Sequence, residues 1–272
     1  MSLALDKRES QKQWDTDPCG AHTVEGFVSE SLEFYRAVRD YRYNVYGPWF
    51  DSMVRFDDVH GKDVLEIGVG LGSDHMRLAS NGNRMTALDL SWEHLRRTRQ
   101  HLALEGLNTQ LVYGDAELMA FRNESFDAVY SFGVLHHTPD IESSISEIHR
   151  VLRPGGVAII GLYHLHSWFF WLQTIVAHGL VQQGLWKKGL KTLMSEIEYR
   201  QNLDTAKPLV RVFSRRRVKT LLKGFSCVEL RTCHVEPSHF WRFRRLVTWL
   251  NRALLERTFG VGGWYVIARA VK

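Results

Sequence analysis

The sequence of 272 residues is poor in cysteine and lacks a long apolar run. Its three cysteines, Cys19, Cys227 and Cys233, form no CxxC pair, and an odd number cannot all pair within one chain. A disulfide scaffold or a structural zinc site is therefore not expected. No apolar run approaches the roughly 18 residues that span a bilayer, and residues 1–13 lack the apolar core of a signal peptide. We expect a cytoplasmic setting.

The chain also lacks internal repeats and low-complexity tracts, and its hydrophobic content of 44% is ordinary for a globular protein. The length fits one large α/β domain with insertions, or two small domains. The net charge of +5 is spread unevenly, because residues 211–257 hold twelve Lys or Arg against three Glu. Such a region could face phosphates, an anionic membrane surface or only water.

A glycine-rich stretch at residues 63–74 organises the rest of the sequence. A short apolar run ends in three glycines at alternate positions, Gly68, Gly70 and Gly72. This pattern predicts a buried parallel strand, a sharp turn that needs glycine backbone angles, and a helix that begins near Ser73. The backbone N–H groups at the start of that helix would face a ligand above the turn. Gly-x-Gly alone is a weak signal that many nucleotide-binding proteins share.

Strands and helices alternate from residue 63 onward, which favours a doubly wound parallel sheet with helices on both faces. The expected strands are 63–67, 84–89, 109–113, 126–131, 157–162, 226–235 and 263–270. The expected additions to this domain are an N-terminal loop and helical cap (1–60) and helical insertions at about 165–205 and 238–258 in the main domain (61–272).

Polar residues follow three further strands. Asp89 ends the second strand and could accept hydrogen bonds from two ribose hydroxyls, as acidic residues do in nucleotide-binding folds. Asp115 follows the third strand and could accept from an exocyclic amine, and residues 131–140 follow the fourth. A dinucleotide fingerprint needs glycine at position 73, where this chain has Ser73. The carboxyl ends of adjacent strands are where open α/β sheets bind ligands.

Residues 61–162 resemble the core of class I S-adenosylmethionine-dependent methyltransferases, and are closest to the small-molecule branch that includes quinone-biosynthesis enzymes. Five motifs in the family's order and spacing carry the resemblance: VLEIGVGLG (64–72), ALDLS (87–91), GDAE (114–117), FDAV (126–129) and EIHRVLRPGG (147–156).

The resemblance implies a Rossmann-like sheet of seven strands whose last strand is antiparallel, and S-adenosylmethionine as the cofactor. It also implies a role for each matching residue. The methionine moiety would lie over Glu66, Gly68, Gly70 and Gly72, the ribose at Asp89, and the adenine beside Leu90, Asp115 and Ala116, while the backbone of Phe132 and Gly133 would receive the amino group.

The activity implied is methyl transfer by in-line displacement to a small, apolar or aromatic acceptor, with the accepted atom (O, S, N or C) undetermined. Because the sulfonium is already activated, holding the acceptor in attack geometry and excluding water supply most of the acceleration. A general base helps only when the acceptor hydroxyl has a high pKa. The candidates for this chemistry are His137, Tyr163 and His164, with loop-holding or rim positions as the alternative.

No metal site is expected, because the histidines and acids lack zinc spacing. We expect Cys19 to be a buried turn cysteine rather than a reactive thiol.

Two other functions remain open. A nucleic-acid methyltransferase could use the basic region as a phosphate track, although Ser131-Phe132-Gly133-Val134 stands where the base-amine methylases of the family carry an Asn/Asp-Pro-Pro-aromatic motif. We therefore expect no specific nucleic acid as a partner. The other alternative is a regulatory protein that binds the cofactor without turnover.

The segment 240–257 is predicted to be a basic, aromatic amphipathic helix. Packing on the sheet is favoured for it, with peripheral contact to an anionic membrane as the alternative. The oligomeric state is left open.

Overall fold

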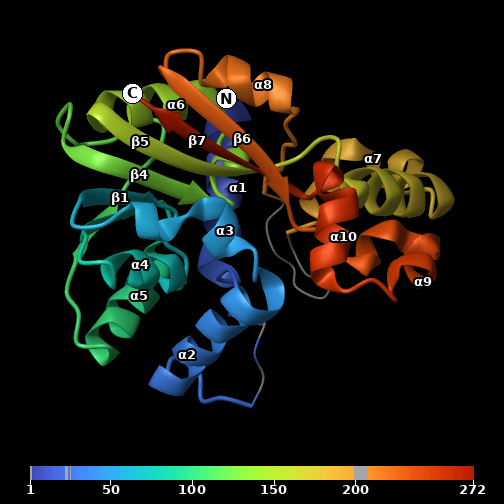
Figure 1. Ribbon diagram of the computed structural model, residues 1–272, viewed down its shortest axis with the longest axis horizontal. Coiled ribbons are helices and arrows are strands. Elements are labelled where there is room, and N and C mark those ends of the chain that lie inside the picture. Colours follow the sequence, from blue (N-terminus) through green and yellow to red (C-terminus); the bar gives the residue numbers. More distant parts are fainter. Residues whose placement is uncertain (1, 22–23, 25, 199–207) are drawn as a thin grey trace.

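The computed structural model describes residues 2–21, 24, 26–198 and 208–272. A single twisted sheet runs through its centre (Figure 1). Its strands are β1 (Asp63–Ile67), β2 (Arg84–Asp89), β3 (Gln110–Tyr113), β4 (Phe126–Phe132), β5 (Leu152–Tyr163), β6 (Cys227–Cys233) and β7 (Tyr265–Val271).

The sheet has seven strands in the order β3-β2-β1-β4-β5-β7-β6. Neighbours from β3 to β5 pair in parallel, whereas β7 pairs antiparallel with both β5 and β6. The chain order reverses between β1 and β4, and this reversal opens a crevice at their carboxyl ends. The expected doubly wound α/β fold with an antiparallel last strand is confirmed.

Helices cover both faces of the sheet, with α4 and α5 on one side and α6 and α8 on the other (Figure 1). The α-helices are α1 (Ser2–Thr16), α2 (Leu32–Asp40), α3 (Phe50–Val54), α4 (Ser73–Ala79), α5 (Trp92–Leu104), α6 (Ile141–Val151), α7 (Gly184–Ser195), α8 (Arg215–Leu221), α9 (Arg244–Val247) and α10 (Arg252–Phe259). The 3₁₀- and π-helical segments are η1 (Tyr41–Tyr46), η2 (Phe56–Asp58), η3 (Leu135–His137), η4 (Phe169–Val181), η5 (Pro237–Phe243) and η6 (Gly260–Gly262).

Two apolar cores hold these layers together. On one face, α6 and α8 bury Ile145, Ile148 and Val218 against the sheet. On the other, the aromatic side chains of Phe50 and Phe56 pack on the central strands. Since burying such side chains stabilises the fold by about 1.5–3 kcal/mol each, the strand ends are held on a rigid base.

The expectation of a loop at the start of the N-terminal region (1–60) is wrong for residues 2–16, which form α1. The spacing of apolar residues did not predict this helix, because the buried face of α1 is largely polar. Ser10 and Gln13 are buried there, and Lys7 reaches an acid of the main domain. Tertiary contacts, rather than an apolar stripe, select the helix.

The second expected insertion is not one continuous amphipathic helix. The 3₁₀ segment η5 breaks at Trp241, whose φ is 49°, and α9 ends at Val247. The Asn251 side chain then accepts a hydrogen bond from the backbone N–H of Leu254 and starts α10. The first insertion is helical as expected, although η4 has π-helical turns and residues 199–205 lie outside the described ranges.

Candidate functional site

A cavity of about 570 Å³ lies over the carboxyl ends of the central strands. Nine of the ten residues expected around a cofactor line this cavity, together with two of the three candidates for catalysis. They are Glu66, Gly68, Gly70, Asp89, Leu90, Asp115, Ala116, Phe132, Gly133, His137 and Tyr163.

In the glycine turn, neighbouring side chains come close to the backbone at Gly68 and Gly72. A Cβ on Gly68 would lie 2.1 Å from a methyl carbon of Val134, and its φ of 81° also disfavours a side chain. At Gly70 and Gly133 nothing lies within 4 Å of the Cβ position, so both backbones border open space. Gly72 does not line the cavity and instead packs against Thr98, 3.2 Å from its Cβ position.

Asp89 is buried at the end of β2 and is fixed by three donors. Its carboxylate accepts hydrogen bonds from the backbone N–H groups of Ser91 at 2.8 Å and Gly70 at 3.4 Å, and contacts His94 Nδ1 at 3.2 Å. Burial alone would raise the pKa of Asp89, but His94 and the backbone donors lower it overall. An ionised carboxylate with remaining acceptor capacity therefore borders the cavity.

Glu66 is buried beneath the glycine turn and contacts His75 Nδ1 at 2.9 Å. His75 Nε2 in turn contacts Thr109 Oγ1 at 2.8 Å, which fixes the imidazole. Burial raises the pKa of Glu66 to about 7, and His75 opposes this shift. The carboxyl group is therefore held in one orientation at the cavity wall.

An ion pair between the partly buried Arg42 and the buried Asp74 forms part of the cavity wall. Arg42 donates two hydrogen bonds to Asp74, at 2.6 and 2.5 Å, and the hydroxyls of Tyr43 and Tyr130 each donate one at 2.6 Å. Burial would raise the pKa of Asp74, but Arg42 and the hydroxyl donors lower it. Four charge-assisted hydrogen bonds to one carboxylate make this a rigid part of the wall.

Aromatic side chains line the other end of the cavity. Tyr163 stacks on Trp264, with ring centroids 4.3 Å apart, and Phe169 lies 4.7 Å from the same indole. The hydroxyls of Tyr46 and Tyr265 share a hydrogen bond. Burial raises the pKa of Tyr163 well above its usual value, so its hydroxyl stays protonated. This end suits a flat or apolar molecule.

His137 lies between the two ends, on η3. Its Nδ1 is 2.6 Å from the carbonyl oxygen of Leu209, and a carbonyl only accepts, so Nδ1 carries the proton and Nε2 has the lone pair. Burial lowers the pKa of His137, although the negative charge of Glu198 opposes this. The ring is therefore neutral at pH 7, with a free base nitrogen.

His164 does not line the cavity. It is buried at the end of β5, where its Nδ1 lies 3.1 Å from the carbonyl oxygen of Gly263. The structure therefore places this candidate away from His137 and Tyr163, in a position that joins β5 to the start of β7. Side chains of neighbouring residues in a strand point to opposite faces, but the sequence does not show which of the two faces the cavity.

Cys19 is exposed to the cavity rather than buried in a turn, so the expectation of burial is wrong. Desolvation by the surrounding protein and the negative charge of Glu198 raise the pKa of Cys19 to about 11. The thiol therefore stays protonated at neutral pH and is a weak nucleophile.

Two groups of histidine and glutamate have ligand atoms within 4.8 Å of one another among the described residues: His136, His137 and Glu198, and His234, Glu236 and His239. In the second group both histidines accept at Nδ1, from the indole N–H of Trp49 and from the backbone N–H of Glu236. Their neutral rings therefore carry the proton on Nε2, which opposes metal binding at those atoms. In the first group Tyr163 donates a hydrogen bond to Glu198. The absence of a metal site stays a prediction.

A family described as "Methyltransferase domain" matches residues 65–160, the segment that holds the glycine turn, Asp89, Asp115 and His137. Residues 65–160 are therefore similar to a methyltransferase domain. The sheet order agrees with this assignment.

Similar proteins support the assignment. A sterol 24-C-methyltransferase of Gibberella zeae is 30% identical over 194 residues, which cover 60% of this chain and 49% of that protein. The 2-methyl-6-phytyl-1,4-hydroquinone methyltransferase 1 of Oryza sativa subsp. japonica is 34% identical over 152 residues, covering 51% of this chain and 45% of that protein. The chain thus spans about half the length of these curated relatives.

Solved structures share the fold. An S-adenosylmethionine-dependent methyltransferase from Mesorhizobium loti superposes with a TM-score of 0.55 at 18% identity, covering 88% of this chain and 100% of that chain. The YcgJ protein from Bacillus subtilis gives a TM-score of 0.54 at 14% identity, covering 82% of this chain and 97% of that chain. At such identities the likeness extends to the fold alone.

The cavity is lined by one element that the sequence did not predict as a helix, α1. Its residues Lys7, Ser10 and Trp14 recur at helical spacing and line the cavity. Lys7 Nζ lies 2.5 Å from Asp115 Oδ2 and 2.5 Å from Glu117 Oε2. The spacing of three and four residues between them is typical of one helix face. Because two of the three residues are polar, this spacing did not indicate a buried helix.

Among the described residues that line the cavity, two buried atoms lack hydrogen-bond partners: Ser10 Oγ and His94 Nε2. Because buried polar atoms are normally paired, these two indicate a polar ligand between α1 and α5. A nucleoside, with its hydroxyls and ring nitrogens, is a ligand that these two atoms fit.

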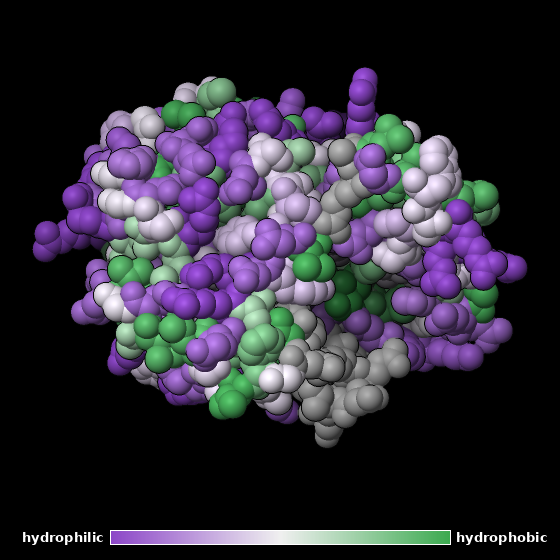
Figure 2. Space-filling view, turned by 60° about the horizontal axis from the view of Figure 1, so that its bottom comes forward, coloured by the Kyte–Doolittle hydropathy of each residue, from purple (hydrophilic) through white to green (hydrophobic). Residues whose placement is uncertain are grey.

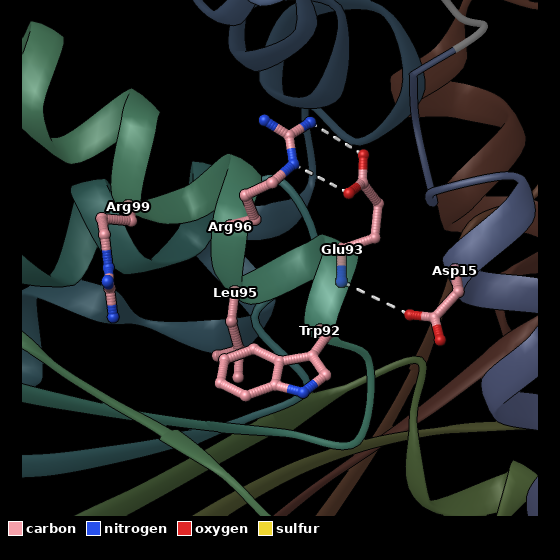
Figure 3. Close-up of a pocket in the computed structure, with 6 residues that line it drawn as sticks. All are labelled: Asp15, Trp92, Glu93, Leu95, Arg96 and Arg99. Atoms are coloured by element: carbon pink, nitrogen blue, oxygen red, sulfur yellow. Dashed lines mark hydrogen bonds and ion pairs between the residues drawn. The ribbon is translucent and has the colours of Figure 1, made fainter.

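The end of α1 is fixed to the start of α5. Asp15 accepts hydrogen bonds from the hydroxyl of Ser91 at 2.6 Å and the backbone N–H of Glu93 at 3.4 Å. Figure 3 shows Asp15 reaching toward the first turn of α5, beside a surface hollow that Trp92 and Arg96 also line. A carboxylate at a helix N-terminus is stabilising, so α1 is anchored over the cavity.

Replacing Trp14 by alanine should weaken binding of S-adenosylhomocysteine about three- to tenfold. Trp14 lies edge-on to His137, at 5.3 Å between ring centroids, and loss of one aromatic contact costs about 0.5–1.5 kcal/mol. Titration calorimetry measures the change, with Lys12→Ala on the exposed face of α1 as the matched control. Equal affinities of the two variants would contradict a role for α1 in the site.

Proposed function

We propose that this methyltransferase binds S-adenosylmethionine with the nucleoside under α1 and the methionine moiety near the glycine turn. Three features support this placement: the ionised Asp89, the open backbone at Gly70 and Gly133, and the unpartnered Ser10 Oγ and His94 Nε2. When bound, the cofactor supplies an electrophilic methyl group on sulfur. The pair of Lys7 with Asp115 would have to open or shift if Asp115 accepts from the adenine amine.

We further propose that the acceptor is a small molecule with an aromatic ring and an acidic hydroxyl group. The observation that carries this proposal is the Nε2 lone pair of His137, which lies beside an aromatic-lined cavity. The two curated relatives are named for a hydroquinone and a sterol, which are apolar acceptors. Deprotonation of a phenolic hydroxyl makes both its oxygen and the adjacent ring carbons nucleophilic.

In this proposal His137 takes the hydroxyl proton at Nε2, while the carbonyl of Leu209 holds the ring through Nδ1. Tyr163 stays protonated and holds Glu198 in place by donating a hydrogen bond to it. The Glu198 carboxylate near His137 then stabilises the imidazolium that forms. The aromatic walls exclude water and orient the ring for attack.

Replacing His137 by glutamine should lower kcat for a phenolic acceptor about 10²- to 10⁴-fold, the usual contribution of a general base. In the wild type, kcat should be flat near neutral pH and should fall as pH drops through the pKa of His137, which burial lowers below 6.5. Initial rates from pH 4.5 to 8.5 test both statements. Because glutamine also removes the ring contact with Trp14, affinity for S-adenosylhomocysteine should fall by no more than about tenfold, far less than kcat. Unchanged rates would contradict the base assignment.

The experiment that tests the function itself is a methyl-transfer screen with labelled cofactor. Phenols, hydroquinones, sterols, thiols, amines and RNA are offered as separate acceptors. Label in the phenols or hydroquinones supports the proposal, and label only in RNA would support the nucleic-acid alternative instead. Cofactor binding with no transfer to any class would favour a regulatory role. The cytoplasmic setting stays a prediction.

A further inference from the structure

The two insertions pack together into one unit beside the sheet, which we call the insertion lobe (169–195 and 237–262). In Figure 1 its labelled helices α7, α9 and α10 lie together, to the right of the strands. Trp168, just before η4, stacks on Phe240 and donates its indole N–H to the carbonyl of Phe259 at 3.0 Å. Val247 and Leu255 are buried in the same cluster. The lobe therefore has a core of its own.

The outer surface of the insertion lobe is unusually apolar. In η5 and α9, Phe243 is 56% exposed and Leu246 is 67% exposed, and Trp249 follows at 76%. Trp186 on α7 is 72% exposed. Figure 2 shows apolar side chains interleaved with polar ones on the right side of the molecule. Other large apolar side chains exposed on the lobe are Trp171, Leu180, Val181, Leu190, Leu254 and Val261.

Arginines alternate with these apolar residues. Arg242, Arg244 and Arg245 are exposed and make no ion pair with any residue that the structure describes. Lys187 on α7 is also exposed and equally without an ion pair in the described ranges. The three arginines thus share one short stretch of chain, 242–249, with the exposed Phe243, Leu246 and Trp249.

We propose that the insertion lobe docks peripherally on the surface of an anionic membrane. Exposed Trp, Phe and Leu insert at the level of the lipid headgroups, and arginines between them pair with lipid phosphates. A second copy of the lobe would bury the apolar residues but would leave the arginines without opposite charges, because Glu256 is the one acid in residues 169–195 and 237–262 and it accepts from the backbone N–H of Val235. Among the described residues no helix is long and apolar enough to cross the bilayer.

The insertion lobe also lies at the acceptor end of the cavity, so membrane docking would serve the methyl transfer that we propose. This part of the inference rests on the proposed function. Phe169 from η4 and His239 from η5 line the aromatic end of the cavity. The elements that carry the exposed apolar surface therefore also form the wall of the acceptor site. A docked lobe would hold the acceptor end next to the bilayer, where an apolar acceptor is concentrated.

Vesicle flotation with the full chain tests the proposal. The wild type should bind vesicles of equal parts phosphatidylglycerol and phosphatidylcholine, and should bind pure phosphatidylcholine at least tenfold more weakly. Raising the salt from about 0.1 M to 0.5 M should release it in part, because salt screens the arginines. Failure of the wild type to bind anionic vesicles would overturn the proposal.

Matched variants locate the surface. Combining Phe243→Ser, Leu246→Ser and Trp249→Ser should weaken vesicle binding at least tenfold. Leu104→Ser, Leu107→Ser and Leu118→Ser, which are exposed outside the lobe, should not. Equal losses in the two triple variants would overturn the assignment.

A second pair of variants tests the charges. Combining Arg242→Gln, Arg244→Gln and Arg245→Gln should weaken binding at least tenfold and reduce its salt dependence. Arg216→Gln, Lys219→Gln and Lys223→Gln remove the same charge from exposed positions on and just after α8, and should have little effect. If the control triple weakens binding as much, net charge rather than the lobe is responsible.

Two readouts separate this proposal from its alternatives. Affinity for S-adenosylhomocysteine should be unchanged in all four triple variants, which shows that they are folded and distinguishes docking from the proposed cofactor site. Light scattering should show the same mass for the wild type and the Phe243, Leu246 and Trp249 triple variant. A wild-type dimer that this triple variant dissociates would show that the surface binds a second copy, and would overturn membrane docking.

Discussion

Replacing Asp89 by alanine should weaken binding of S-adenosylhomocysteine at least tenfold. The carboxylate is buried and ionised, and the protein uses only part of its acceptor capacity, through Ser91, Gly70 and His94. A hydrogen bond to a charged group contributes about 1.5–3 kcal/mol, and tenfold in affinity corresponds to about 1.4 kcal/mol. Loss of even one hydrogen bond to the ribose therefore gives the expected change.

Titration calorimetry measures this affinity, and two further variants make the result interpretable. Asp89→Asn keeps one acceptor oxygen and should fall between the wild type and the alanine variant. Glu93→Ala removes an acid from the first turn of the neighbouring helix α5 that does not line the cavity, and should leave the affinity unchanged. An alanine variant that binds as tightly as the wild type would overturn the ribose assignment.

The largest effect on stability is expected at Asp74. Its replacement by alanine would leave the partly buried Arg42 guanidinium and Tyr43 hydroxyl, and the fully buried Tyr130 hydroxyl, without their acceptor. Removing one partner of a buried ion pair costs about 3–5 kcal/mol, since an uncompensated charge stays in the interior. Denaturant unfolding followed by circular dichroism measures this loss.

An exposed ion pair provides the control for Asp74. Arg84 contacts Asp63 at 2.6 Å but is 75% exposed, so Arg84→Ala should cost less than about 1 kcal/mol. The pH dependence follows from the lowered pKa of Asp74. Its stabilisation is complete above the unfolded pKa of about 3.9 and is lost as pH falls below it. If both variants unfold at the same denaturant concentration, the buried pair contributes no more than a surface pair.

The local chemistry of the cofactor side could be predicted from the sequence. Gly68 is followed by a turn that excludes a Cβ, and Asp89 stands at the end of a strand, so each position carries its own signal. The parallel order of the strands then brings their carboxyl ends to one edge. Residues 64–156 were interpretable because strand, turn and helix there depend mainly on neighbours in sequence.

The acceptor side was harder to predict because its residues meet only through the fold. Tyr163 and His164 are neighbours in sequence, yet one lines the cavity and the other joins β5 to β7. The proton on His137 is assigned by the carbonyl of Leu209, 72 residues away. Such contacts leave no periodic trace in the sequence.

The structure of the N-terminal helix also could not be predicted from the sequence. Residues 2–16 lack an apolar stripe, so a loop was expected there. In the structure, Lys7 pairs with Asp115 and Asp15 accepts a hydrogen bond from Ser91, and these contacts hold the helix on the main domain. In the second insertion, the positive φ of Trp241 and the cap at Asn251 break the expected helix. Tertiary contacts decided the structure of both segments.

By itself, the sequence determined the α/β core and the residues at its ligand-binding edge, because glycine angles, strand periodicity and acids at strand ends are local properties. Only the tertiary structure decided which side chains share the cavity, which nitrogen of His137 is free, and that the insertions expose Phe243, Leu246 and Trp249 beside arginines. The physical reason is that burial, tautomer and pKa depend on atoms that come together from distant parts of the chain.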